Sequence, residues 1–278
     1  MYRYSRIYTG KLKTLVGDWS GTFIDPYVVA PAVVFCEVFK KFKVPISMRE
    51  ARVPMGLRKD LHIKAILENP DVKDRWYKQY KRNPCSRDVD EMFKEFVPLQ
   101  VKVLPKYCEI LPYTYEFANI VRNEFDMKIG ITTGFTSPMV NVILNEVKKQ
   151  GFVPDSSVAG DEVNNGARPT PSMIWKNLDI LGTMDIKSVL KIGDTVGDIG
   201  EGLNAGCWTC GLSKYSNYMD IDNSKHACSL SIKELEEREE HTREILLKAG
   251  AHYVVKDLSD IPQIISHINW KLSCGYFP

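Results

Sequence analysis

Two short segments of the chain place carboxylates beside small residues, each directly after an apolar run. Asp18 leads the first segment (18–22), and Asp194 and Asp198 belong to the second (193–198). The apolar runs are typical of buried strands, and open parallel sheets bind ligands at the carboxyl ends of their strands. Aspartates gathered there can hold a hard cation such as Mg²⁺, and a metal-held aspartate is a credible nucleophile toward phosphorus.

Groups that could bind phosphate oxygens recur at the same predicted edge. Backbone amides, hydroxyls and a guanidinium suit this task because they donate hydrogen bonds to anions. The arginine lies in a loop that two prolines stiffen (166–171). The candidates are Gly21, Thr132, Thr133, Gly134 and Arg168.

Each of these residues also has an ordinary structural explanation. Asp18 could cap a turn, Asp194 could cap a helix with Asp198 as a solvated neighbour, and Arg168 could be a surface charge. Because the groups occur together at predicted strand ends, their order along the chain favours a site.

Composition narrows the class of protein. The chain has 278 residues and a formal net charge of +2, which is too balanced to predict a nucleic-acid partner. No apolar run approaches the roughly 20 residues that span a bilayer, and residues 1–6 lack the apolar core of a signal peptide. Seven unpatterned cysteines, including the pair Cys207 and Cys210 in a predicted strand, favour reduced thiols and a cytoplasmic location.

The pattern of elements predicts an α/β protein with a doubly wound parallel sheet. A first strand at 12–17 and a helix at 30–43 precede a charged, aromatic stretch at about 47–102, where we expect helices broken at Pro70, Pro84 and Pro98. Strand and helix then alternate from about residue 105. The later strands are predicted at 127–132, 157–159, 189–193, 208–212 and 252–255, and the later helices at 116–125, 138–150, 171–181, 233–249 and 258–270.

The order of these motifs resembles the haloacid dehalogenase superfamily. Within it, the phosphonoacetaldehyde hydrolase (phosphonatase) family matches four stretches, of which Pro-Met-Gly-Leu-x-Lys at 54–59 is the most specific. The stretches are 18–22, 50–59, 130–136 and 191–195, and 204–209 extends the last. The resemblance implies a Rossmann-like core at 1–25 and 105–278, and an inserted helical cap at 26–104.

The resemblance also assigns roles to residues. Phosphatases of the superfamily carry an acid two residues after the nucleophile. Phosphonatases usually have alanine there, and this chain has Ser20, which cannot act as a general acid. A lysine that condenses with the substrate aldehyde takes over the task of making the leaving group viable, and Lys59 holds that position. Its pKa must then be lowered, by burial or by nearby cations. Met55 and His62 match residues that line the family's site.

The implied reaction converts phosphonoacetaldehyde, a small-molecule phosphonate, to acetaldehyde and phosphate. Asp18 would attack phosphorus, and Mg²⁺ would bind Asp18, the Ser20 carbonyl and Asp194, with Asp198 in the outer shell. The five phosphate-binding candidates would hold the phosphonate. Family members often form homodimers through the cap, where Trp76, Tyr77 and Tyr80 could serve either that contact or the cap's own core. Neither a nucleic-acid nor a membrane partner is expected.

Three alternatives stay open at this point. The chain could be a phosphate-monoester hydrolase or a phosphomutase of the same superfamily, which Ser20 disfavours. It could also be a non-catalytic phosphate-binding or partner-binding module. Gly17, where the family commonly has a large apolar residue, predicts looser packing beneath Asp18.

Overall fold

A six-stranded parallel sheet forms the centre of the computed structural model, which describes residue 8 and residues 10–278. The strand order is β3-β2-β1-β4-β5-β6, so the chain winds outward in both directions from β1 and β4. The leader segment considered at 1–6 lies outside the described residues. The strands are β1 (Thr14–Gly17), β2 (Lys128–Thr133), β3 (Ser156–Ala159), β4 (Val189–Gly193), β5 (Trp208–Leu212) and β6 (Tyr253–Val255).

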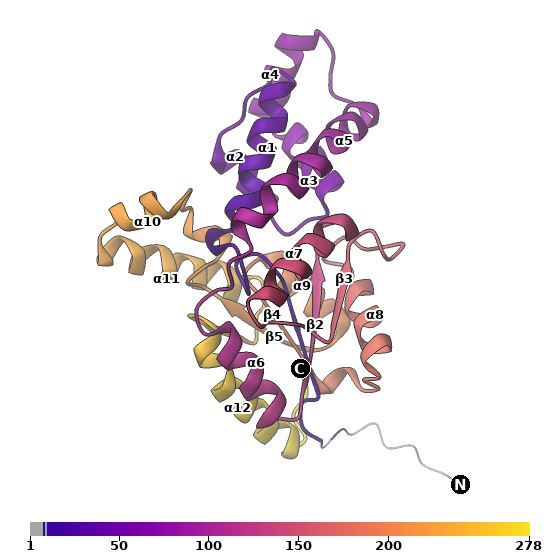
Figure 1. The fold of residues 1–278 in the computed structure, drawn as a ribbon, viewed down its shortest axis with the longest axis vertical. Helices are drawn as coiled ribbons and strands as arrows, with labels where there is room; N and C mark the ends of the chain where they lie inside the picture. Colours follow the sequence, from indigo (N-terminus) through magenta and orange to yellow (C-terminus); the bar gives the residue numbers. More distant parts are fainter. Residues whose placement is uncertain (1–7, 9) are drawn as a thin grey trace.

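Helices cover both faces of this sheet, which confirms the doubly wound α/β prediction (Figure 1). Leu15, Ile129 and Ile192 belong to the main core, and Val16 and Val189 to a smaller cluster. One layer comprises α6 (Thr114–Asn123), α7 (Ser137–Lys149) and α12 (Ile261–Ser273). The other comprises α8 (Ser172–Leu181), α9 (Val196–Ala205) and α11 (Ile232–Lys248), with a short α10 (Ser224–Ser229) before α11.

Five helices between β1 and β2 gather beyond the carboxyl ends of the strands (Figure 1). They are α1 (Val29–Lys41), α2 (Met48–Arg52), α3 (Lys59–Glu68), α4 (Pro70–Tyr80) and α5 (Ser86–Val103). Pro70 occupies the first turn of α4 and Pro84 precedes α5, as expected of helix boundaries. The expectation for Pro98 is wrong, because this proline lies inside α5.

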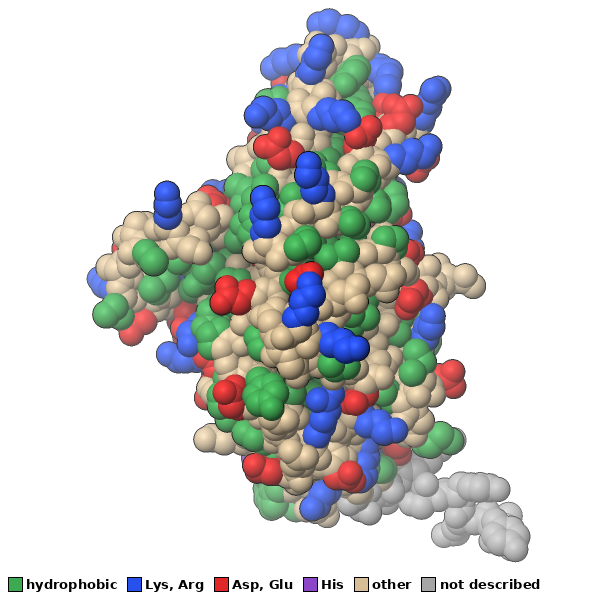
Figure 2. Space-filling model, in the orientation of Figure 1, with side chains coloured by type: hydrophobic (Ala, Val, Ile, Leu, Met, Phe, Trp, Pro, Cys, Tyr) green, Lys and Arg blue, Asp and Glu red, His purple; other side chains and the backbone are tan. Residues whose placement is uncertain are grey.

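The formal charges of the chain nearly balance, with a net charge of +2. On the face in Figure 2, Lys and Arg side chains are spread widely and interspersed with Asp and Glu. Among the described residues, no helix is long and apolar enough to cross a membrane.

Candidate active site

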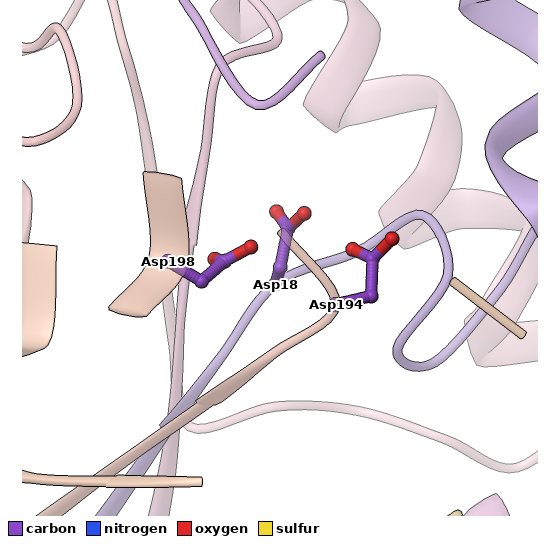
Figure 3. Close-up of side chains that lie close together, drawn as sticks. All are labelled: Asp18, Asp194 and Asp198. Carbon is purple, nitrogen blue, oxygen red and sulfur yellow. The ribbon is translucent and has the colours of Figure 1, made fainter. Parts of the chain in front are cut away.

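Three aspartates meet at the point where the winding of the sheet reverses. Asp18 follows β1, Asp194 follows the neighbouring β4, and Asp198 lies in the first turn of α9. All three are buried, and each offers a carboxylate oxygen within 4.8 Å of the others (Figure 3). Local sequence explains the position of Asp198, since Thr195 and Asp198 form a capping box that starts α9.

Two buried cations, Arg168 and Lys191, pair with two of these aspartates and with Glu201. Arg168 Nη2 lies 3.1 Å from Asp18 Oδ1 and 3.1 Å from Asp198 Oδ1, while its Nε lies 3.0 Å from Glu201 Oε2. Lys191 Nζ lies 2.9 Å from Asp198 Oδ1 and 3.4 Å from Glu201 Oε2. Burial opposes the charge on Arg168, but Asp18, Asp198 and Glu201 outweigh it and hold the pKa of Arg168 well above its usual value.

Asp194 is the carboxylate that this network leaves uncompensated. Its Oδ2 accepts a hydrogen bond from the Asn217 amide at 2.8 Å, but its buried Oδ1 has no hydrogen-bond partner among the residues that the structure describes. Burial, Asp198 and Asp18 together raise the pKa of Asp194 well above its usual value.

Carboxylates outnumber the cations with which they pair at this edge of the sheet. The buried Asp18, Asp198 and Glu201 pair with Arg168 and Lys191, and the buried Asp194 pairs with neither. Oxygen donors from Asp18 and Asp194 suit a hard divalent cation. Asp198 is less available as a direct ligand, because its Oδ1 already faces both Arg168 and Lys191.

Lys59 enters the same cavity from the helical insertion. It begins α3 and is only 4% exposed, with its Nζ 4.8 Å from the centre of the Phe135 ring. Burial lowers the pKa of Lys59 to about 8, an effect that Asp18 partly offsets and Arg168 reinforces. A buried amine with this pKa is neutral part of the time at neutral pH, which nucleophilic chemistry requires.

The cavity itself is narrow. Its volume is about 20 Å³, roughly that of one ordered water, so a substrate can enter only after the walls move. The core contributes Asp18, Ser20, Thr133, Gly134, Phe135, Arg168, Asp194 and Thr195, and the insertion contributes Val28, Pro31, Met55, Gly56 and Lys59.

The loop that carries Met55 touches the core at two glycines. A Cβ on Gly56 would lie 2.7 Å from Thr195 Oγ1, and one on Gly134 would lie 2.5 Å from the Leu57 carbonyl oxygen. A side chain at either position would collide with the atoms that face it, so the two glycines permit the loop to lie this close to the core.

Gly21 lies at the site with a different function from the one expected. Its amide donates to the carbonyls of Ile24 and Asp25, so it is not free to bind a phosphonate oxygen. Gly21 has φ +76°, and an added Cβ would lie 2.6 Å from the Asp194 carboxylate. The structure therefore corrects the prediction: this glycine lets the backbone pass close to Asp194.

Two further predicted residues lie behind the cavity wall rather than in it. The Thr132 hydroxyl donates to Glu201 and accepts from Arg168 and Lys191. His62 is fully buried, stacks on Phe35, and places Nε2 2.8 Å from the Ala51 carbonyl. Burial and Lys59 lower the pKa of His62 well below its usual value, so this ring is neutral.

Packing beneath Asp18 is tight, contrary to the expectation for Gly17. The Phe23 ring occupies the space where a Cβ on Gly17 would lie. Phe23 also packs against Phe152, with ring centroids 5.0 Å apart. The aromatic ring thus replaces the apolar side chain that position 17 lacks.

Sequence comparison with known proteins finds relatives that match nearly the whole chain. The chain is 39% identical over 271 residues to a phosphonoacetaldehyde hydrolase from Syntrophobacter fumaroxidans, covering 98% of this chain and 97% of that protein. It is 37% identical to the enzyme of that name from Bacillus cytotoxicus, covering 93% and 97%. The chain belongs to the phosphonoacetaldehyde hydrolase family.

One solved structure agrees with this family assignment. A phosphonoacetaldehyde hydrolase-like protein from Oleispira antarctica superposes over the whole of both chains with a TM-score of 0.95 and 30% identity. No protein-family model matches the chain.

Two charged residues of this phosphonoacetaldehyde hydrolase family member lie at the site but were not predicted from the sequence. Lys191 and Glu201 are both fully buried and both contact Thr132. Lys191 could have been predicted, because a lysine inside the apolar strand run 189–193 needs charged or polar partners once it is buried. Glu201 could not have been predicted, because it lies 33 residues from Arg168 in the chain and only the fold brings the two together.

Replacing Glu201 by glutamine is expected to lower kcat by about 10- to 100-fold, as loss of an outer-shell partner typically does. The amide removes the charge that holds Arg168 Nε, so Nη2 loses its alignment on Asp18. Steady-state kinetics check this, with Glu236→Gln at an exposed position of α11 as the control and thermal unfolding to verify the fold. An unchanged kcat would contradict the role of Glu201.

Proposed function

We propose that this chain hydrolyses the carbon–phosphorus bond of phosphonoacetaldehyde to give acetaldehyde and phosphate. The observation that carries the proposal is that the buried Lys59, with its lowered pKa, and the buried Asp18 line one cavity. Ser20 lines the same cavity, at the position where phosphatases of the superfamily carry an acid. The names of the relatives from Syntrophobacter fumaroxidans and Bacillus cytotoxicus support the same substrate.

Lys59 makes carbon a viable leaving group. Its neutral amine adds to the aldehyde and expels water, which forms an iminium. When the carbon–phosphorus bond breaks, its electron pair flows into the iminium and yields an enamine. Protonation at carbon and hydrolysis then release acetaldehyde and restore the amine.

Asp18 accepts the phosphoryl group. Its carboxylate attacks phosphorus to form an aspartyl phosphate, which water hydrolyses to phosphate. Arg168, Thr133 and the Gly134 amide bind the phosphonate oxygens, since all three residues line the cavity. Met55 and Phe135 shield the lysine from solvent.

The metal in this proposal is Mg²⁺, held by Asp18, the Ser20 carbonyl and Asp194, with Asp198 orienting the ligands. When bound, it neutralises charge between the nucleophile and the phosphonate. Asp194 Oδ1, which has no hydrogen-bond partner among the described residues, and the raised pKa of this carboxyl beside Asp198 and Asp18 support this assignment.

The domain organisation belongs to the same proposal. Residues 26–104 act as a cap that opens for the substrate and closes to deliver Lys59, over a core formed by 1–25 and 105–278.

The protein acts as a homodimer through the cap. Trp76 is fully buried within the cap, whereas Tyr77 (53% exposed) and Tyr80 (36% exposed) are available for the dimer contact. A molar mass by light scattering that halves in Tyr77→Lys would support this contact, and a monomeric wild type would refute it.

The function is tested by measuring acetaldehyde and phosphate release from phosphonoacetaldehyde with Mg²⁺ and after chelation. Equal, metal-dependent release of both products is expected. Turnover of sugar phosphates without cleavage of phosphonoacetaldehyde would instead support a phosphate-monoester hydrolase or phosphomutase. A folded protein that turns over neither would support a binding module.

The pH dependence follows from Lys59. Because its pKa is about 8, the reactive neutral amine grows from about one part in a hundred at pH 6 to about half at pH 8. We therefore expect kcat/KM to rise about 50-fold between these values and to level off above pH 8. A rise that continues to pH 10 would show an ordinary lysine and contradict the assignment.

A further inference from the structure

Arg52 joins the helical insertion to the core. It ends α2, is only 4% exposed, and directs its guanidinium at groups outside its own helix. Nη2 donates to the Ile221 carbonyl at 2.6 Å, and Nη1 donates to the carbonyl of Tyr27 and to Asn217 Oδ1 at 3.3 Å. Five donors in a rigid fork suit such divergent acceptors, which a lysine could not satisfy together.

Asn217 connects this arginine to the candidate metal ligand. Its side-chain amide donates back to the Arg52 carbonyl at 3.2 Å, so the two residues bind each other in both directions. Its backbone amide donates to Asp194 Oδ2 at 2.8 Å. One residue therefore separates Arg52 from Asp194, whose Oδ1 has no hydrogen-bond partner in the described part of the chain.

The same arginine also controls the loop that leads to the lysine. Arg52 directly precedes residues 53–58, which carry Met55 and Gly56 and end at Lys59. Anchoring Arg52 on the core holds one end of this loop where Gly56 meets Thr195. A movement of the loop that also displaces Arg52 would break or stretch the Arg52–Asn217 contacts.

The contacts lie at the edge of a solvent-filled groove. The groove has a volume of about 730 Å³, and Arg49, Arg52, Asn217 and Asp220 line it. Asp222, whose carboxylate lies 3.7 Å from Arg52 Nε, is 42% exposed. Water can thus reach the rim of the contact while its centre stays buried, which suits a contact that forms and breaks.

We propose that Arg52 and Asn217 are positioning residues that couple closure of the 53–58 loop to the orientation of Asp194. The inference rests on the proposed function for the identity of the reaction. When the loop closes, Arg52 fixes Asn217, and the Asn217 amide then fixes Asp194 Oδ2 so that Oδ1 faces the cavity. Lysine delivery and metal-ligand alignment thereby occur in one step.

The test compares Arg52→Lys with Arg49→Lys, an exposed arginine on the same helix. Arg52→Lys keeps the charge and loses the fork. We expect about 10-fold weaker Mn²⁺ binding by calorimetry, faster amide hydrogen exchange at Asn217, and a fall in kcat that exceeds any rise in KM. Arg49→Lys should leave all three unchanged.

The first two readouts need no turnover, so they separate this inference from the proposed function. Wild-type protein that fails to cleave phosphonoacetaldehyde would refute the function and leave the coupling measurable. Unaltered Mn²⁺ affinity and Asn217 exchange in Arg52→Lys would overturn the coupling. If Arg52→Lys does not fold, Asn217→Ala, which keeps the backbone amide, must show the same weaker Mn²⁺ binding, and wild-type affinity there would equally overturn it.

Discussion

Substituting Lys59 by arginine is expected to lower acetaldehyde release by about 10⁴-fold, which corresponds to about 5.5 kcal/mol of transition-state stabilisation. Arginine retains the positive charge and the length, but its guanidinium stays protonated and cannot form an imine. Without an imine, the electron pair of the breaking bond has no acceptor. The measurement is acetaldehyde and phosphate release under saturating substrate and Mg²⁺.

Trapping with borohydride separates this chemical role from a loss of fold. Incubation of the wild type with acetaldehyde and borohydride should leave an N-ethyl group on Lys59, found by peptide mass spectrometry. Lys59→Arg should lack the label, whereas Lys64→Arg, an exposed position on the same helix α3, should keep both label and activity. A label at full yield in Lys59→Arg would place the imine on another lysine.

The sequence predicted the chemistry best where local pattern and topology coincide. Asp18 and Asp194 follow apolar strand runs, and parallel strands place such positions at one edge of a sheet. The structure brings both together with Asp198 within 4.8 Å. Lys59 was found by resemblance alone, because a lysine in a charged, helical stretch is indistinguishable by composition from a solvated one.

The remaining features depend on contacts that local pattern does not encode. Glu201 pairs with Arg168 only through the fold. Gly21 was expected to bind the substrate because a free amide and a hydrogen-bonded one look alike in sequence. Pro98 was expected to end a helix, but α5 packs against α1 and α3, and this packing outweighs the lost hydrogen bond.

Substituting Asp18 by asparagine is expected to separate the two halves of the reaction. The amide has nearly the size of the carboxylate but no nucleophilic oxygen, so phosphate release should fall by about 10⁴-fold or more. Imine formation at Lys59 should survive. Asp18 raises the pKa of Lys59, and without that charge the pKa falls below about 8, which leaves more neutral amine at pH 7.

Both outcomes can be read from the same protein sample. Phosphate release is followed by colorimetry, and imine formation by borohydride trapping with acetaldehyde at pH 7. Asp179→Asn, at an exposed position of α8, is the control. A retained label with lost phosphate release would place Asp18 after the imine, as attack on phosphorus requires. Equal loss of label and phosphate in a folded Asp18→Asn would mean that the carboxylate acts on Lys59 instead, since a nucleophile toward phosphorus is not needed to condense an amine with an aldehyde.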